Sequence, residues 1–214
     1  ALRSAPAASG FHLMAKPSGP ACNLACDYCF YLEKETLFGQ PATRRMSREV
    51  LDAYIRQTIA ATPADQPVLF TWQGGEPTLL GIEFYVEALR LQRHYGGGRA
   101  IENSFQTNGT LIDEDWARFL ADHRFLIGLS LDGPQEIHDR TRRYRSGAGS
   151  HAQVMAALER VLHATPPPLP GAPPLPATTS VFTSTDVLAL WKIPTLGPPA
   201  PRPPAPPAPP APPA

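Results

Sequence analysis

Short apolar runs alternate with segments of helical periodicity along most of the chain. The expected strands, each short and either alternating or continuously apolar, are residues 11–16, 68–72, 101–106 and 125–131. The expected helices, with apolar residues three and four positions apart, follow Ser47, span 82–89, follow Asp113 and follow Ser150. Four successive strand–helix units predict an α/β fold with a parallel sheet. The nearly continuous apolar runs predict strands covered on both faces.

Polar, glycine-bearing segments follow all four expected strands. They are ACNLACDYCFY at 21–31, QGGEPT at 73–78, QTNGT at 106–110 and SLDGP at 130–134. The carboxyl ends of parallel strands meet at one edge of a sheet, where α/β proteins build their sites. We therefore expect a functional site at this edge.

The composition changes abruptly near Thr165. The chain has 27 prolines, and 19 of them follow that residue, ending in repeats of PPA. This predicts a flexible N-terminus at 1–10, a core domain at 11–165, and a disordered, low-complexity tail at 166–214. Within the tail, 178–193 alone has apolar content and is either weakly strand-like or disordered. The break suggests a tail read out of frame.

Charge and hydropathy narrow the classes of partner and compartment. Lys plus Arg and Asp plus Glu are both 19, so bulk charge predicts neither nucleic-acid nor membrane binding. No apolar run approaches the roughly 18 residues of a membrane-spanning helix. The N-terminus lacks the apolar stretch of a secretory signal, which predicts a cytoplasmic location.

The three cysteines, Cys22, Cys26 and Cys29, lie within eight residues of one another. A disulfide would leave one thiol over and needs an oxidising compartment. A zinc site wants a fourth ligand, for which His12 is the available candidate. The remaining interpretation is an iron–sulfur cluster held by three thiolates, with one iron open to a further ligand.

The spacing C-x3-C-x2-C, with Tyr28 before the last cysteine, resembles the signature of the radical S-adenosylmethionine (SAM) superfamily. The segments CNLACDYCFY, FTWQGGEPTLLG, FQTNGTLID and GLSLDGPQEIHDRTRR together resemble the anaerobic sulfatase-maturating enzymes. The resemblance runs from about Phe11 to about His163. It implies an incomplete parallel (β/α) barrel of the radical SAM type, with about four βα units.

The resemblance also implies the chemistry and the partners. A 4Fe-4S cluster on Cys22, Cys26 and Cys29 would bind and reductively cleave SAM, so that a hydrogen atom is taken from a substrate. In these maturases the substrate is a Cys or Ser of a sulfatase polypeptide, which becomes formylglycine. The electron would come from a donor such as a flavodoxin or ferredoxin.

Five further residues match SAM-contacting positions of the family. Gly74 and Gly75 would let the backbone approach SAM where a Cβ would clash, with Gly75 at the amino group. Tyr28 would contact the adenine, Ser130 the ribose and Arg142 the carboxylate. Each residue also has a structural alternative. The glycines can form a plain Gly-Gly turn, Tyr28 can pack beside the cluster, Ser130 can be a turn residue, and Arg142 can belong to a solvated basic run.

Two residues match positions that touch the peptide substrate, Gln73 and Tyr31, although a polar strand end and an aromatic beside a cluster are both common. The family's catalytic base, its fifth and sixth strands and its cysteine-rich domain would all fall beyond the resemblance. The catalytic residue is therefore unknown here, and we expect no formylglycine from this chain. The alternatives are another peptide-modifying radical SAM enzyme and a non-catalytic, cluster-binding remnant.

Overall fold

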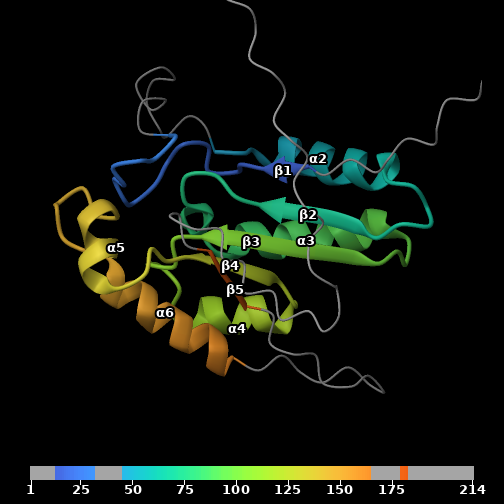
Figure 1. The fold of residues 1–214 in the computed structure, drawn as a ribbon. Coiled ribbons are helices and arrows are strands. Elements are labelled where there is room, and N and C mark those ends of the chain that lie inside the picture. The colour runs from blue at the N-terminus through green and yellow to red at the C-terminus, as the bar shows by residue number, and fades with distance from the viewer. Residues whose placement is uncertain (1–12, 32–44, 165–178, 183–214) are drawn as a thin grey trace, which may run out of the picture.

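The computed structural model describes residues 13–31, 45–164 and 179–182. One parallel sheet with the order β1-β2-β3-β4-β5 organises these residues (Figure 1). The strands are β1 (Met14–Ala15), β2 (Val68–Trp72), β3 (Ile101–Thr107), β4 (Leu126–Ser130) and β5 (Thr179–Phe182). The flexible N-terminus expected at 1–10 and nearly all of the expected tail lie outside the described residues.

The four expected strands are confirmed, and each pairs with the next in parallel. Of the two alternatives for 178–193, the strand-like one is confirmed at Thr179–Phe182, because β5 pairs in parallel with β4, with Leu129 opposite Val181. A strand edge presents a row of unpaired N–H and C=O groups, and a short β-prone segment can satisfy them. The apolar stretch within the tail supplies that segment.

The helices are α2 (Arg48–Ala61), the 3-10 helix η2 (Pro77–Leu80), α3 (Ile82–Gly96), α4 (Glu114–Asp122), α5 (Gln135–Thr141) and α6 (His151–His163). Ser47 caps α2, since its side chain accepts from Val50 N at 3.3 Å. Asp113 caps α4 in the same way, through Trp116 N at 2.9 Å. The short elements η2 and α5 were not predicted, because seven residues or fewer show little periodicity. Among the described helices, none combines the length and hydropathy of a membrane-spanning segment.

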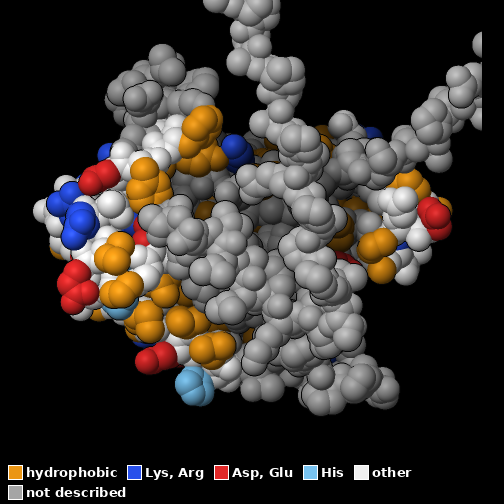
Figure 2. All heavy atoms as spheres, in the orientation of Figure 1, with side chains coloured by type: hydrophobic (Ala, Val, Ile, Leu, Met, Phe, Trp, Pro, Cys, Tyr) orange, Lys and Arg blue, Asp and Glu red, His pale blue; other side chains and the backbone are white. Residues whose placement is uncertain are grey.

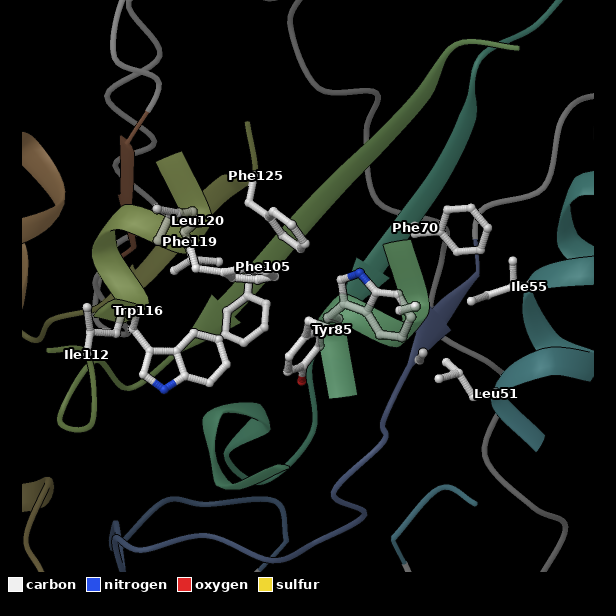
Figure 3. Close-up of a cluster of buried hydrophobic side chains, with 14 of the residues drawn as sticks. Leu51, Ile55, Phe70, Tyr85, Phe105, Ile112, Trp116, Phe119, Leu120 and Phe125 are labelled. Carbon is white, nitrogen blue, oxygen red and sulfur yellow. The ribbon is translucent and has the colours of Figure 1, made fainter. Parts of the chain in front are cut away.

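An aromatic core lies between the sheet and the helices α2, α3 and α4 (Figure 3). Trp72 is fully buried and stacks on Phe70, with ring centroids 6.1 Å apart. Tyr85 of α3 meets Phe105 of β3 edge-on at 5.0 Å. Aromatic residues bury the largest areas, so this layer provides much of the stability of the domain.

The opposite face of the sheet is more polar than the sequence predicts. Thr71 and Ser104 share a hydrogen bond of 2.8 Å across β2 and β3, and Leu69 stays 42% exposed. Among the described residues, the expectation of strands covered on both faces is therefore wrong for β2, whereas on β4 the successive residues Ile127, Gly128 and Leu129 are all buried. Alternate residues of a strand point to opposite faces of the sheet. The aromatic side chains of β2 and β3 therefore face the helices, and the residues between them, which are mostly polar, lie on the opposite face.

Candidate functional site

A cavity of about 320 Å³ lies at the carboxyl end of the sheet. In Figure 1 the arrowheads of β2 and β3 point toward the blue segment that carries the cysteines and toward α5. All ten expected site residues line this one cavity: Cys22, Cys26, Tyr28, Cys29, Tyr31, Gln73, Gly74, Gly75, Ser130 and Arg142. A second cavity of about 620 Å³ lies between α4 and α6 and contains no cysteine.

The cysteine segment is fixed against the chain that follows α5. Leu24 forms an antiparallel bridge with Tyr144. Ala25 N donates to Arg143 O at 2.8 Å, and Asp27 N donates to Thr141 O at 2.9 Å. These bonds lie on either side of position 142. The cysteine segment and Arg142 therefore form one structural unit.

The Gly-Gly turn after β2 packs against the approach to the first cysteine. Gly75 N donates to Gly19 O at 2.8 Å, and a Cβ on Gly75 would lie 2.1 Å from Ala21 O. Gly74 has a φ of 129°, a conformation that favours glycine. The expected reason for Gly75, room for SAM, is therefore incomplete, because the chain's own backbone already excludes a side chain there.

The three thiols are free and line the cavity without converging on one ion. Among the described residues, no three His, Cys, Asp or Glu side chains are grouped as a site for a single metal. His12, the candidate fourth zinc ligand, lies outside the described residues. Three thiolates spaced around a common cavity fit a cluster of several irons better than a zinc ion.

Burial raises the pKa of two of the thiols, Cys22 and Cys26. It raises the pKa of Cys22 to about 11, and the negative charge of Glu76 adds to the shift. Burial also raises the pKa of Cys26, against the opposing effect of the Arg142 guanidinium. Backbone amides reach two of the sulfurs, Leu24 N to Cys22 Sγ at 3.4 Å and Tyr31 N to Cys29 Sγ at 3.4 Å. Such donors stabilise the thiolate form that a cluster needs.

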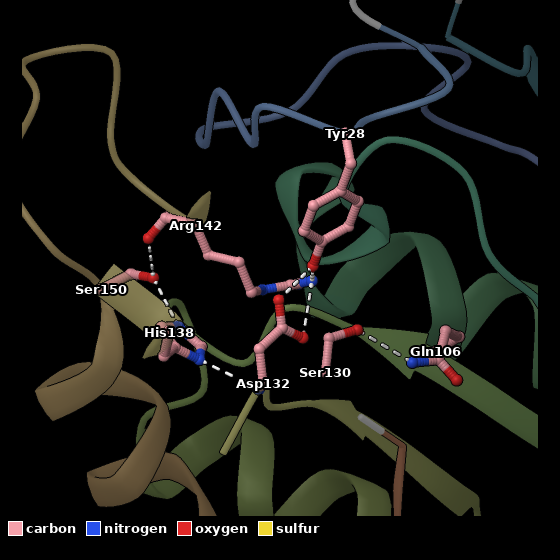
Figure 4. Close-up of polar contacts among 7 residues, drawn as sticks. All are labelled: Tyr28, Gln106, Ser130, Asp132, His138, Arg142 and Ser150. Atoms are coloured by element: carbon pink, nitrogen blue, oxygen red, sulfur yellow. Dashed lines mark hydrogen bonds and ion pairs between the residues drawn. The ribbon is translucent and has the colours of Figure 1, made fainter. Parts of the chain in front are cut away.

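Arg142 is buried and joins the cysteine segment to the loop after β4 (Figure 4). Its Nη1 donates to the Tyr28 hydroxyl at 2.6 Å and lies 3.8 Å from Asp132 Oδ1. The Tyr28 hydroxyl in turn donates to Asp132. Burial lowers the pKa of Arg142, but the negative charges of Cys26 and its other neighbours outweigh this and raise it overall.

The Nε of Arg142 has no hydrogen-bond partner among the described residues, although it is buried beside the cavity. An unpaired buried donor is costly unless a ligand satisfies it. The alternative interpretation, that Arg142 belongs to a solvated basic run, is wrong, because Arg142 is only 8% exposed. It does describe Arg140 and Arg145, which are exposed beside α5, where Figure 2 shows basic side chains gathered.

A buried histidine, His138, which the sequence did not reveal, links the loop after β4 to the backbone of Arg142. Asp132 N donates to His138 Nδ1 at 3.2 Å, so the ring proton is on Nε2, which lies 2.9 Å from Ser150 Oγ. Ser150 Oγ donates to Arg142 O at 2.8 Å. Burial lowers the pKa of His138, and the Arg142 charge lowers it further. The neutral imidazole thus links the β4 loop to the backbone of Arg142.

The other expected residues lie around the same opening. Ser130 Oγ accepts from Gln106 Nε2 at 3.1 Å, so the hydroxyl hydrogen is available to a further acceptor. Tyr31 lies beneath Lys16, whose Nζ is 5.0 Å from the ring centroid. Gln73 is tied to β1 through its backbone, with N donating to Ala15 O at 2.9 Å.

Sequence reasoning also missed Glu76 and Asn108, which connect two of the glycine-bearing segments. Glu76 is fully buried and accepts from Thr78, from Thr107 Oγ1 at 2.7 Å and from Asn108 N at 2.8 Å. Burial raises the pKa of Glu76 against these hydrogen bonds. The Glu directly after the Gly-Gly pair was the available signal, since a charge next to a buried turn needs several donors.

Comparison with known proteins agrees with this fold. The Radical SAM superfamily model matches residues 17–167. The chain therefore belongs to the radical SAM superfamily, and its sheet is a partial barrel of that type.

The resemblance to the sulfatase maturases is confirmed by two curated relatives. The chain is 44% identical over 154 residues to the serine-type anaerobic sulfatase-maturating enzyme of Bacteroides thetaiotaomicron, a match covering 72% of this chain and 37% of that protein. It is 43% identical over 148 residues to the cysteine-type enzyme of Clostridium perfringens strain ATCC 13124, covering 69% and 40%. The chain thus spans about two fifths of the length of these relatives.

Solved structures give the same fold. Native anSMEcpe with bound AdoMet and Cp18Cys peptide matches with a TM-score of 0.62 at 42% identity, covering 70% of this chain and 39% of that one. Native anSMEcpe with bound AdoMet matches with a TM-score of 0.63 at 41% identity, covering 69% and 39%. Both structures are of one protein, anSMEcpe, which binds AdoMet (SAM) in both and a peptide in the first.

Proposed function

We propose that this chain binds a 4Fe-4S cluster through Cys22, Cys26 and Cys29, and SAM in the same cavity. The observation that carries the proposal is the convergence of these thiols with a buried, incompletely bonded Arg142 on one cavity. When bound, the cluster and SAM together supply one-electron radical chemistry. The chain's own residues hold, orient and shield these groups.

Each wall of the cavity offers one kind of contact to SAM. The Arg142 guanidinium suits the carboxylate, because its planar array of donors matches two oxygens. The turn at Gly74 and Gly75 offers backbone groups to the amino end. The Ser130 hydroxyl can donate to the ribose, and the backbone at Tyr28 can meet the adenine. Family membership and the AdoMet-bound relatives support this assignment.

The substrate we propose is a peptide segment of a sulfatase, with a Cys or Ser oxidised to formylglycine. The maturase relatives and the peptide-bound structure support a peptide substrate. Tyr31 and Gln73 line the cavity, so they can contact a peptide bound there. The electron donor we expect is a flavodoxin or a ferredoxin.

The test begins with anaerobic reconstitution of the full chain with iron and sulfide. We expect Cys26→Ser to lose iron. Arg142→Leu should keep its iron but lose most binding of labelled SAM in equilibrium dialysis. The matched control is Arg160→Leu, which removes a surface contact to Glu114 at 2.9 Å and should change neither value. A wild-type chain without iron, or undiminished SAM binding by Arg142→Leu, would contradict the proposal.

The substrate is tested separately, with sulfatase peptides carrying the target Cys or Ser. The loaded chain is incubated with SAM and a strong reductant, and the peptide is analysed by mass spectrometry. We expect no formylglycine from this chain; its formation would support the maturase assignment and overturn that expectation. A different modification favours another peptide-modifying enzyme, and bound but uncleaved SAM favours a non-catalytic binder.

A further inference from the structure

Asn108 brings a side-chain donor to a cysteine sulfur. It follows β3 in the QTNGT segment, is 5% exposed, and its Nδ2 lies 3.6 Å from Cys22 Sγ. The same Nδ2 donates to Asn23 Oδ1 at 2.9 Å. The other donors to the cysteine sulfurs among the described residues are backbone amides. Asn108 is therefore the donor that a substitution can remove.

The orientation of the Asn108 amide follows from its neighbours. Its Oδ1 accepts from Thr110 N at 2.9 Å and from Thr110 Oγ1 at 2.7 Å. A backbone N–H can only donate, so the atom that faces it must be the amide oxygen. The NH₂ group consequently faces Cys22.

The backbone of Asn108 is held as firmly as its side chain. Its N–H donates to Glu76 Oε2 at 2.8 Å, and the carboxylate is fully buried with three further donors on Oε1. Fixing a donor in advance removes the entropy that a mobile side chain would lose on bonding. The buried Glu76 thus explains how Asn108 keeps its place beside the sulfur.

We propose that Asn108 is a positioning residue whose N–H···S hydrogen bond sets the reduction potential of the cluster bound at Cys22. The inference rests on the proposed function, because it concerns the same cysteines. Hydrogen bonds to the sulfurs are one of the factors that set cluster potentials. Reduction adds negative charge to the cluster and its ligands, and a positive N–H dipole stabilises that charge. Asn108 therefore raises the potential and eases reduction.

Two variants at this position measure the effect. Asn108→Leu removes the donor at similar size, and Asn108→Asp keeps the Oδ1 acceptor while placing a carboxylate beside the sulfur. We expect both to shift the midpoint potential of the cluster to more negative values, with the larger shift for Asn108→Asp. The measurement is an anaerobic redox titration of the reconstituted full chain, followed by electron paramagnetic resonance.

Asn103, which lies on β3 itself, provides the matched control. It is also buried, and its amide bonds to Trp72 Nε1 at 2.9 Å and to Gln92, outside the cavity. The same two substitutions there carry a similar folding cost without a sulfur neighbour. They should leave the potential unchanged in the protein that still folds and binds iron.

The outcomes separate this inference from the proposed function. A wild-type chain that takes up no iron overturns both. A wild-type chain that loads iron, with unchanged or more positive potentials in the Asn108 variants, overturns the role of Asn108 alone. If Asn108→Leu loses its cluster, the midpoint potential of Asn108→Asp shows whether Asn108 has this role. A negative shift at position 108 and none at 103 supports the inference.

Discussion

Two regions of this sheet are stabilised by different means: the layer that packs against the helices, and the carboxyl end that carries the cavity. Toward the helices, Phe70, Trp72 and Phe105 pack in an apolar layer in which ring contacts dominate. At the carboxyl end, glycines, amides and charged groups meet through hydrogen bonds between distant segments. The first region depends on the packing of large rings against one another. The second depends on close approach of backbones, so it is sensitive to a single added atom.

The largest effect should come from breaking the aromatic layer. Trp72→Ala removes a fully buried ring that contacts Tyr54, Phe70, Phe84 and Tyr85. Large-to-small core substitutions of this kind cost about 3–5 kcal/mol of folding free energy. Urea unfolding followed by circular dichroism should show the loss, and iron binding should fall with it. A folded variant of wild-type stability would mean that this layer does not hold the domain together.

The next largest effect should come from Gly75→Ala, which acts on the site without touching the aromatic layer. Its Cβ would meet Ala21 O at 2.1 Å and displace the segment that enters the first cysteine. We expect iron and SAM binding to fall together, with helix content retained. Gly81→Ala is the control, because its Cβ would meet nothing within 4 Å and only its φ of 79° is strained. Loss of SAM binding with full iron would instead favour a direct role toward SAM.

A smaller effect is expected from Tyr28→Phe, which removes one hydroxyl between Arg142 and Asp132. Iron content should stay the same, while SAM affinity should fall about tenfold, as for the loss of one charge-assisted hydrogen bond. Tyr95→Phe is the control, since it removes a hydroxyl–carboxylate bond to Asp52 at 2.9 Å far from the cavity. Equal SAM affinities for the two variants would exclude this role for the Tyr28 hydroxyl.

The smallest effect should be a dependence of stability on pH that originates at His138. Its pKa is lowered in the folded state by burial and by Arg142, so the unfolded chain binds a proton more readily. Stability should therefore fall as the pH drops below the unfolded value of about 6.5. Urea unfolding of the wild type and of His138→Gln at several pH values measures the difference. If stability depends on pH equally in both proteins, His138 is not the origin of the pH dependence.

Much of the fold was predictable from the sequence because local patterns determine it. The caps Ser47 and Asp113 depend on neighbouring residues, and the apolar run at Val68–Trp72 predicts a strand before its pairing with β1 and β3 is known. The sheet edge was predictable for the same reason, since polar segments followed all four strands. β5 was predictable only as one of two alternatives, because the apolar content of the tail is weak and Thr179–Phe182 is stabilised as a strand by pairing with β4.

The sequence predicted which residues line the site but not which of them contact one another. All ten expected residues line one cavity, yet their contacts join positions far apart in sequence. Tyr28 and Arg142 are separated by 114 residues, and Asn108 and Cys22 by 86. His138 and Ser150 gave no sequence signal, because their role depends on a tautomer fixed by Asp132 N.

The docking of the cysteine segment against the chain after α5 has a consequence for synthesis on the ribosome. Tyr28 is made 114 residues before its partner Arg142. At about 5–20 residues per second, that interval is on the order of ten seconds. During it the nascent cysteines lack the bridge between Leu24 and Tyr144 that later fixes their loop. The thiols are thus translated early and immobilised late, and the order of translation itself leaves a period in which they are open to metal delivery or to oxidation.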